Sequence, residues 1–261
     1  MLHGVPAMYA KLLDWARQSG TTLRSPALRI AQLGGAPMTQ ALKDDFERAF
    51  GQTLHNGYGL TESSPSISQT RLDAPRRDCS VGPPIPGVSV RIVDADGRDV
   101  APGAVGELWV QGPNVMKGYY RNPELTHATV TAEGWLKTGD LARREADGAL
   151  FIVGRSKELI IRSGFNVYPV EVEQAINAHP QVVQSAVVGR SVDANEEVVA
   201  FVEAAAGSGL TAEALAAHLR GCLSPYKLPA EIVFLDQLPA SATGKILKNA
   251  LKERAAAKPA R

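Results

Sequence analysis

Apolar and polar positions in the first part of the chain follow either helical or strand-like spacing. Segment 6–18 carries apolar residues at helical intervals and predicts a helix. The runs LRIAQL at 28–33 and QTLHNGYGL at 52–60 predict two short strands. Between them, Thr39 and Gly51 bound a second predicted helix as its N-cap and its stop. Strand, glycine-rich loop, helix and strand in succession indicate an α/β layer, whose ligands bind beyond the carboxyl ends of its strands.

The pattern changes to short alternating runs near Pro75. These runs extend from VGPPIPGVSVRIVDADGRDV to GALFIVGR, with turns at Asp96-Gly97 and Asp147-Gly148. Such turns between alternating runs are typical of β-hairpins. We therefore expect a small β-barrel-like or sandwich subdomain over about 76–154.

The charged segment GRSKE at 154–158 suggests a domain boundary, with a hinge at 155–158. The chain then alternates between strand-like and helical patterns, which predicts a small α+β domain over 159–261. At its N-terminal end, the chain has only one predicted strand before its first glycine turn, at 34–37. A layer of two strands leaves an edge unpaired. We therefore expect 1–154 to be the C-terminal portion of a larger α/β domain.

Composition excludes several classes of function. The chain has 261 residues, 44% of them hydrophobic, and a net charge of +1, which offers no footprint for nucleic acid or an anionic membrane. No run reaches the roughly 18 consecutive apolar residues of a membrane-spanning helix, and the N-terminus does not have the pattern of a secretory signal. The two cysteines, Cys79 and Cys222, match no metal-ligand spacing, which favours a reducing cytoplasm.

The stretch NGYGLTE at 56–62 combines side chains suited to a nucleotide. Gly57 and the glycine after the tyrosine let the backbone approach a ligand closely. Tyr58 can lie flat on a base, and Thr61 can donate to a phosphate oxygen. Glu62 supplies a carboxylate for a hard cation such as Mg²⁺. The alternative is a glycine-rich turn with a packed tyrosine.

Asp140, Arg155, Gly164 and the turn at 33–37 could also contact a nucleotide or its phosphates. Asp140, in GWLKTGD, can accept hydrogen bonds from the paired hydroxyls of a ribose, or it is a turn residue. Arg155, in GRSK, presents a fork for ribose or phosphate oxygens, or it forms a surface ion pair. Gly164, in RSGFNVYP, frees backbone N–H groups near a strand end, or it closes a hairpin. The turn LGGAP at 33–37 gains interest because it lies one βαβ step before NGYG.

Lys245 stands in PASATGKILK, on a small polar loop before the last predicted helix. A lysine in such a loop is a solvated surface charge or a cation delivered to a reaction elsewhere in the fold. The glycine before it gives the loop conformational freedom. The residues alone leave both interpretations open.

Taken in order, the motifs LGGAP, NGYGLTE, GWLKTGD, GRSKELIIRSGFNVYPVEVE and ATGK strongly resemble the adenylate-forming superfamily. That superfamily contains acyl- and aryl-CoA ligases, peptide-synthetase adenylation domains and firefly luciferase. The resemblance covers nearly the whole chain and is closest to bacterial acyl-CoA ligases, often called long-chain fatty-acid–CoA ligases. It implies an acid–thiol ligase that uses ATP, Mg²⁺ and coenzyme A and forms an acyl-adenylate from a carboxylic acid.

The resemblance also implies a role for each motif. Lys245, Thr61 and Glu62 are implied as catalytic, with Glu62 helping to hold Mg²⁺, and Lys157 matches the hinge. Residues around Gly164 are implied to line the pantetheine path. The residues implied to bind the nucleotide and cofactor are Gly34, Gly35, Ala36, Pro37, Asn56, Gly57, Tyr58, Gly59, Asp140, Arg155 and Gly164.

One family motif is not found: the Ser/Thr/Gly-rich loop with a lysine that holds the β- and γ-phosphates. The segment SGTTLRSPA at 19–27 lacks its Gly-Lys ending. We therefore expect the chain to correspond to the C-terminal half of a ligase, with an upstream half-enzyme as a possible partner. The alternatives are an adenylation domain that feeds a carrier protein, or a non-catalytic fragment that needs a partner half.

Overall fold

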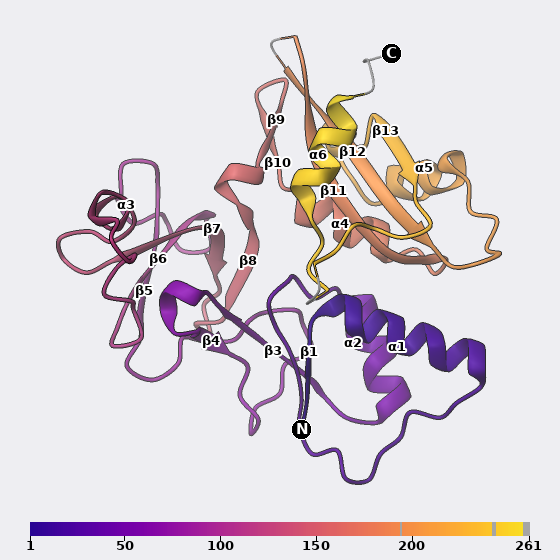
Figure 1. Ribbon diagram of the computed structural model, residues 1–261, viewed down its shortest axis with the longest axis horizontal. Coiled ribbons are helices and arrows are strands. Elements are labelled where there is room, and N and C mark those ends of the chain that lie inside the picture. Colours follow the sequence, from indigo (N-terminus) through magenta and orange to yellow (C-terminus); the bar gives the residue numbers. More distant parts are fainter. Residues whose placement is uncertain (194, 242–243, 258–261) are drawn as a thin grey trace. The chain divides into compact units, whose positions relative to one another are not determined.

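The computed structural model describes residues 1–193, 195–241 and 244–257 (Figure 1). The chain forms two compact units, whose border falls between Lys157 and Glu158, inside the segment 155–158 suggested as a hinge. Unit 1 comprises Met1–Gly4, Pro26–Met38 and Gln52–Lys157. Unit 2 comprises Val5–Ser25, Thr39–Gly51 and Glu158–Arg261.

The first sheet of unit 1 has four strands in the order β1-β2-β3-β4. Its strands are β1 (Leu2–Gly4), β2 (Ala31–Leu33), β3 (Leu54–Gly59) and β4 (Ser66–Gln69). The first three run parallel, and β4 pairs antiparallel with β3. The sequence predicted β2 and β3 but missed β1 and β4, so the layer has four strands instead of the two read from the sequence. Both missed strands are short, and β4 carries one apolar side chain, Ile67, which gives no period to read.

The second sheet of unit 1 is an open antiparallel sheet in the order β5-β6-β7-β8. Its strands are β5 (Ser89–Val93), β6 (Gly106–Gln111), β7 (Leu136–Arg144) and β8 (Leu150–Arg155). The predicted strands and turns are confirmed, but the barrel-like subdomain is corrected, because within the described ranges β5 does not pair with β8. A sheet closes into a barrel only when tilted and staggered strands bring its first and last strands together. Here β5 and β8 remain the two edges of the sheet. A short helix, α3 (Pro123–Thr129), was not predicted.

A single apolar cluster joins the two sheets of unit 1. It includes Ile67 from β4 and alternate residues of β6, Leu108 and Val110. Leu150 of β8 exchanges backbone hydrogen bonds with the loop between β4 and β5, accepting from Val81 N and donating to Gly82 O. Because this core takes residues from both sheets, it stabilises the position of β3 relative to β7 and β8.

Unit 2 contains a three-stranded sheet covered on both faces (Figure 1). The strands are β11 (Val182–Val192), β12 (Asn195–Ala204) and β13 (Glu231–Phe234), with β11–β12 antiparallel and β12–β13 parallel. Alternate residues of β12 face opposite ways. Val198, Ala200 and Val202 pack with α4 (Pro169–Asn177) and α5 (Ala212–Arg220). Val199 and Phe201 pack with α6 (Lys248–Ala256).

Two N-terminal helices also belong to unit 2, namely α1 (Pro6–Ser19) and α2 (Gln40–Phe50). The predicted caps of α2 are confirmed: Thr39 Oγ1 accepts from Leu42 N at 3.3 Å, and Gly51 is left-handed with φ 68°. The helices contact through Tyr9 and Phe46, whose rings meet edge to face at 5.2 Å. In the described part of the chain, no helix is both long and apolar enough to cross a membrane.

Candidate functional site

The two glycine-rich loops of unit 1 lie side by side at one edge of the first sheet. Leu33, the last residue of β2, is in parallel register with Asn56 of β3. A Cβ atom on Gly34 would lie 3.5 Å from the carbonyl oxygen of Gly57. Gly35 has φ 78°, which accommodates the turn that continues into Ala36 and Pro37. LGGAP and NGYG therefore open on the same edge of the sheet, as their places one βαβ step apart suggested.

Asn56 uses its side chain to hold this edge together. Its Nδ2 donates to the carbonyl oxygens of Cys79 and Ser80 at 3.1 and 3.2 Å, and its Oδ1 accepts from Gly57 N at 3.0 Å. The residue is buried, with 3% of its surface exposed. Both ends of the amide are thus engaged within the protein, so Asn56 shapes the loop from beneath.

The two glycines beside Tyr58 differ in how closely the backbone packs around them. A Cβ atom on Gly57 would approach the flexible side chain of Gln32, 3.3 Å from its Nε2. A Cβ atom on Gly59 would overlap the carbonyl oxygen of Pro65. That oxygen accepts a hydrogen bond from Leu60 N at 2.9 Å, which closes the tight turn after β3. Gly59 is therefore required by the fold of the loop itself.

We expect Gly59→Ala to lower the free energy of unfolding by about 2 kcal/mol, because the backbone must move to admit the methyl group. Gly57→Ala is the matched control, since a side chain can give way there, and we expect it to cost less than about 1 kcal/mol. Urea denaturation followed by circular dichroism measures both. Equal losses in the two variants would contradict the contrast drawn from their surroundings.

Tyr58, Asp140 and Arg155 form a bonded cluster in unit 1. The Tyr58 hydroxyl donates to Asp140 Oδ2 at 2.6 Å, and Arg155 Nε lies 2.7 Å from Asp140 Oδ1. Asp140 on β7 and Arg155 on β8 are opposite each other in the strand register. The Asp140 side chain is 3% exposed, whereas that of Arg155 is 47% exposed. Burial, and next the nearby Asp140 carboxylate, raise the pKa of Tyr58, so its hydroxyl stays a donor.

Both oxygens of the Asp140 carboxylate are bonded to neighbouring side chains. Oδ2 accepts from the Tyr58 hydroxyl, and Oδ1 pairs with Arg155 Nε. Asp140 N donates to Thr138 Oγ1 at 3.1 Å, which fixes the backbone at this point of β7. The cluster is therefore a fixed, largely buried acceptor beside the glycine loops, and this suits a ligand with adjacent hydroxyl groups.

Thr61 and Glu62 begin the short 3₁₀ helix η1 (Thr61–Ser63) that follows β3. Thr61 is exposed and Glu62 is half-buried. Glu62 is held by a segment that sequence reasoning missed: its Oε1 accepts from the Tyr119 hydroxyl at 2.8 Å, and its backbone oxygen accepts from Met116 N at 2.8 Å. The hydrogen bond to Glu62 raises the pKa of Tyr119.

The setting of Glu62 fits one carboxylate ligand of a magnesium ion. Among the residues that the structure describes, no group of three or more His, Cys, Asp or Glu side chains could hold a metal. Mg²⁺ keeps several waters and takes one or two carboxylates together with substrate phosphates, so a lone carboxylate suffices. The hydrogen bond from Tyr119 engages Oε1 of Glu62 and orients the carboxylate.

The predicted hinge residue Lys157 is the last residue of unit 1 and lies in the 3₁₀ helix η2 (Ser156–Glu158). The hydroxyl of Ser156 donates to Gly139 O at 2.7 Å, which ties the end of unit 1 to the residue before Asp140. Within unit 2, Gly164 has φ 82° and follows Ser163 with φ 52°. These two left-handed residues close the hairpin between β9 (Ile160–Arg162) and β10 (Phe165–Val167).

Lys245 is exposed on the loop between β13 and α6. This loop is hairpin-like: Ala240 and Ile246 form an antiparallel bridge, and Leu247 N donates to Pro239 O at 2.8 Å. Gly244 has φ 82°, as a tight turn before Lys245 requires. Residues 242–243 of the motif lie outside the described residues.

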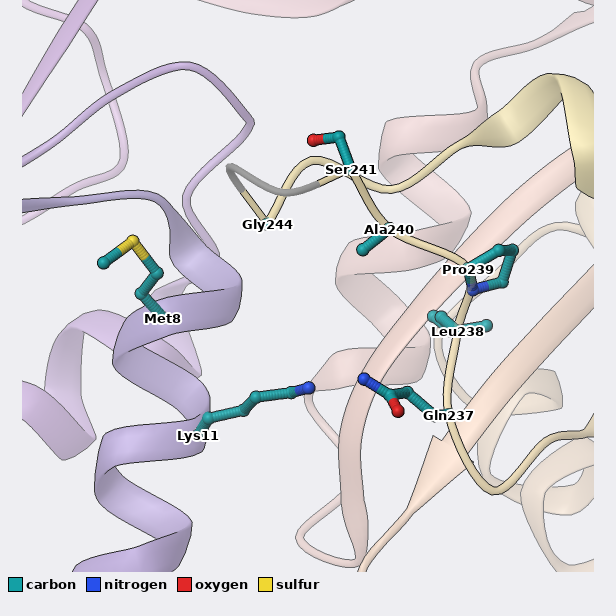
Figure 2. Close-up of a pocket in the computed structure, with 8 residues that line it drawn as sticks. All are labelled: Met8, Lys11, Gln237, Leu238, Pro239, Ala240, Ser241 and Gly244. Carbon is teal, nitrogen blue, oxygen red and sulfur yellow. The ribbon is translucent and has the colours of Figure 1, made fainter.

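A cavity in unit 2 lies between α1 and the loop that carries Lys245 (Figure 2). From α1, Met8 and Lys11 line it, and the side chains of Lys11 and Gln237 are directed toward each other. The residues that line it are Met8, Lys11, Gln237, Leu238, Pro239, Ala240, Ser241 and Gly244. The loop therefore has open space on its α1 side.

Sequence reasoning also missed Lys248, Glu158 and Glu173, which form a charged cluster in unit 2. Lys248 Nζ lies 2.9 Å from Glu158 Oε2 and 2.9 Å from Glu173 Oε1. Nothing in GKILK separates Lys248 from an ordinary surface lysine. Its burial follows from the packing of α6, which the local sequence does not show.

Comparison with known protein families gives two matches along the chain. The model of the AMP-binding enzyme family matches residues 1–120. The model of the AMP-binding enzyme C-terminal domain matches residues 171–245. Together they include the glycine loops, Glu62 and Lys245.

Curated proteins and solved structures resemble this chain along nearly its whole length. A long-chain-fatty-acid–CoA ligase of Yersinia pestis is 41% identical over 250 residues, which are 96% of this chain and 44% of that ligase. The crystal structure of ATP-bound MatB from Rhodopseudomonas palustris matches with a TM-score of 0.88 at 36% identity, covering 97% of this chain and 50% of MatB. An anthranilate CoA ligase in complex with anthranoyl-AMP matches with a TM-score of 0.90 at 28% identity, over 98% and 49% of the two chains. The chain thus spans about half the length of these relatives.

Proposed function

Because this chain belongs to the family of AMP-binding enzymes, we propose that it is the part of an ATP-dependent acid–CoA ligase that holds the acyl-adenylate. The observation that carries the proposal is the buried Asp140 carboxylate, fixed by Tyr58 and Arg155 beside two glycine-rich loops. That arrangement offers a flat ring, an acceptor for paired hydroxyls and a cation within one unit. These are the groups that an adenosine monophosphate moiety requires.

In this proposal, the residues of unit 1 bind the nucleotide. Asp140 accepts the two ribose hydroxyls, and Arg155, half-exposed, donates to ribose or phosphate oxygens. The ring of Tyr58 stacks on the adenine. The turn of Gly34, Gly35, Ala36 and Pro37 flanks the adenine and the acyl carbonyl, supported by Asn56, Gly57 and Gly59.

The first step of the proposed reaction joins the acid to the nucleotide. A carboxylate oxygen attacks the α-phosphorus of ATP, the bond to the bridging oxygen breaks, and pyrophosphate leaves. Thr61 donates to an α-phosphate oxygen, and Lys245 brings an ammonium to the oxygens where negative charge accumulates. Glu62 would hold Mg²⁺, which offsets phosphate charge when bound.

The second step transfers the acyl group to coenzyme A. The thiol sulfur attacks the acyl carbonyl carbon and loses its proton to solvent, a C–S bond forms, and the acyl C–O bond breaks so that AMP leaves with its electrons. Residues around Gly164 line the pantetheine path in this proposal. Rotation of 159–261 about the hinge 155–158, with Lys157 in it, removes Lys245 from the nucleotide between the steps.

For the domains we propose the limits that the sequence indicated: residues 1–154 form the C-terminal portion of the large AMP-binding domain, with the β-rich part over about 76–154, and 159–261 form the lid. This division assigns α1 and α2 to the large domain, whereas in the structure they pack in unit 2. We further propose a fatty acid as the acid substrate, which is what the name of the Yersinia pestis relative states for that protein. A cytoplasmic location and an upstream half-enzyme as partner belong to the same proposal.

Exchange of labelled pyrophosphate into ATP tests the proposal. The chain is assayed with a panel of fatty and aromatic acids, alone and together with the N-terminal half of a related ligase. We expect acid-dependent exchange when both halves are present, and thioester formation when coenzyme A is added. Exchange followed by transfer only to a carrier protein would favour an adenylation domain. No exchange in either setting, with both halves folded, would contradict a ligase function.

A further inference from the structure

The cation of Lys248 lies between two carboxylates in unit 2. Its Nζ lies 2.9 Å from both Glu158 Oε2 and Glu173 Oε1, and the three side chains are 21%, 27% and 12% exposed. Burial disfavours the charge of Lys248, but the carboxylates of Glu173 and Glu158 outweigh it and raise the pKa of the amine. Lys248 is thus the positive member of a cluster that contains two acids.

The three members of the cluster come from separate elements. Lys248 is the first residue of α6 and follows directly on the loop that carries Lys245. Glu158 is the first residue of the C-terminal segment of unit 2 and the last residue of the proposed hinge 155–158. Glu173 lies on α4, and its Oε1 also accepts from Val187 N of β11 at 2.8 Å. The cluster therefore connects the loop, the hinge side of the unit and its sheet.

The other end of the Lys245 loop is also attached to the sheet. Leu238 N donates to Glu203 Oε2 at 3.1 Å, and Glu203 on β12 is 9% exposed. Between these two attachment points, the bond from Leu247 N to Pro239 O closes the loop at its base. A loop fixed at both ends moves with its unit rather than independently of it.

We propose that Lys248 is a positioning residue for Lys245, since its ion pairs with Glu158 and Glu173 fix the C-terminal end of the Lys245 loop to the hinge side of unit 2. The catalytic purpose of this tether rests on the proposed function. Without the Lys248 cation, the two carboxylates have no positive charge between them, the first turn of α6 loosens, and Lys245 samples more positions.

Unit 2 contains a similar cluster that serves as a matched control. Arg190 lies between Glu197 at 2.7 Å and Glu231 at 2.6 Å, on the three-stranded sheet. It is buried, and its two partners are 28% and 27% exposed. Arg190→Met therefore removes a cation from between two acids in the same unit, at a cluster built on the three strands rather than on α6.

Hydrogen–deuterium exchange on the full chain tests the tether. In Lys248→Met, we expect the described amides of 239–247 to exchange about tenfold faster than in the wild type. We expect Lys248→Arg to restore slow exchange. We expect Arg190→Met to lower the melting temperature but to leave the exchange rates of these amides unchanged. Equal exchange in Lys248→Met and wild type, or equal acceleration in Arg190→Met, would overturn the proposal.

Half-reactions of the complete enzyme, with this chain joined to its N-terminal half, test the catalytic consequence. We expect Lys248→Met to slow adenylation about tenfold more than thioester formation from preformed acyl-adenylate, because Lys245 serves the first step. Equal slowing of both steps would reduce Lys248 to a structural role and overturn the proposal. If the wild type adenylates no acid, the proposed function fails, whereas the exchange data still report separately on the tether.

Discussion

We expect alanine in place of Lys245 to slow adenylation by about 10²–10³ in a complete enzyme that contains this chain, the usual cost of losing one positioned charge-stabilising donor. The loss falls on the step in which negative charge accumulates on the α-phosphate and the bridging oxygen. Lys245 is exposed at the end of a closed loop, so the substitution removes no packing from unit 2. Its effect on the free energy of unfolding is therefore expected to stay below about 0.5 kcal/mol.

Separate assays of the two half-reactions measure this effect. Thioester formation from preformed acyl-adenylate should stay near the wild-type rate, because the proposed position of Lys245 serves only the first step. Lys252→Ala, on the following helix α6, is the control for loss of a lysine in the same unit. Unchanged adenylation in Lys245→Ala would return Lys245 to the class of solvated surface charges. Equal loss in both steps would show that the lysine also serves the thiol.

Asp140→Ala is expected to weaken AMP binding about 10- to 100-fold, because two ribose hydroxyls lose a charged acceptor in a buried site. It also leaves the Tyr58 hydroxyl without its 2.6 Å partner, which is expected to cost about 1–3 kcal/mol of stability. Arg155 is half-exposed and regains water, so it adds little to that loss. Isothermal titration calorimetry with AMP and urea denaturation measure the two effects.

Two variants separate binding from folding at this cluster. Tyr58→Phe removes the donor to Asp140 Oδ2 but leaves the carboxylate, so we expect AMP binding to change less than in Asp140→Ala. Asp140→Asn keeps an acceptor oxygen without the charge, so we expect an intermediate loss. An unchanged dissociation constant for AMP in folded Asp140→Ala would contradict the ribose assignment.

Glu62 shows how far the candidate site is readable from sequence. Its residue type and its place after a glycine turn identify a carboxylate that is suited to Mg²⁺. Its partner Tyr119 is 57 positions away in the chain and carries no motif of its own, so the hydrogen bond between them becomes visible only in the fold. The same holds for Tyr58 and Asp140, which are separated by 82 positions.

Several features of this protein were determined by the sequence alone, because they depend on neighbouring residues. Thr39 and Gly51 bound α2 through hydrogen bonds and a left-handed φ that are local to the helix ends. The alternation along β12 sets which of its residues face each side of the sheet. The order of the motifs was also sufficient to indicate the family, as the match to AMP-binding enzymes bears out.

Tertiary structure alone decided the features that depend on distant partners. The strands β1 and β4 are too short to show a period and exist through pairing with β2 and β3. The strands β5 to β8 form an open sheet because closure depends on strand tilt and stagger, which local patterns do not encode. Lys248 became a half-buried, paired cation because α6 packs near two acids, one of them 90 positions away in the chain. Residue type sets the charge of a side chain, whereas burial and partners, which determine what that charge does, follow from long-range packing.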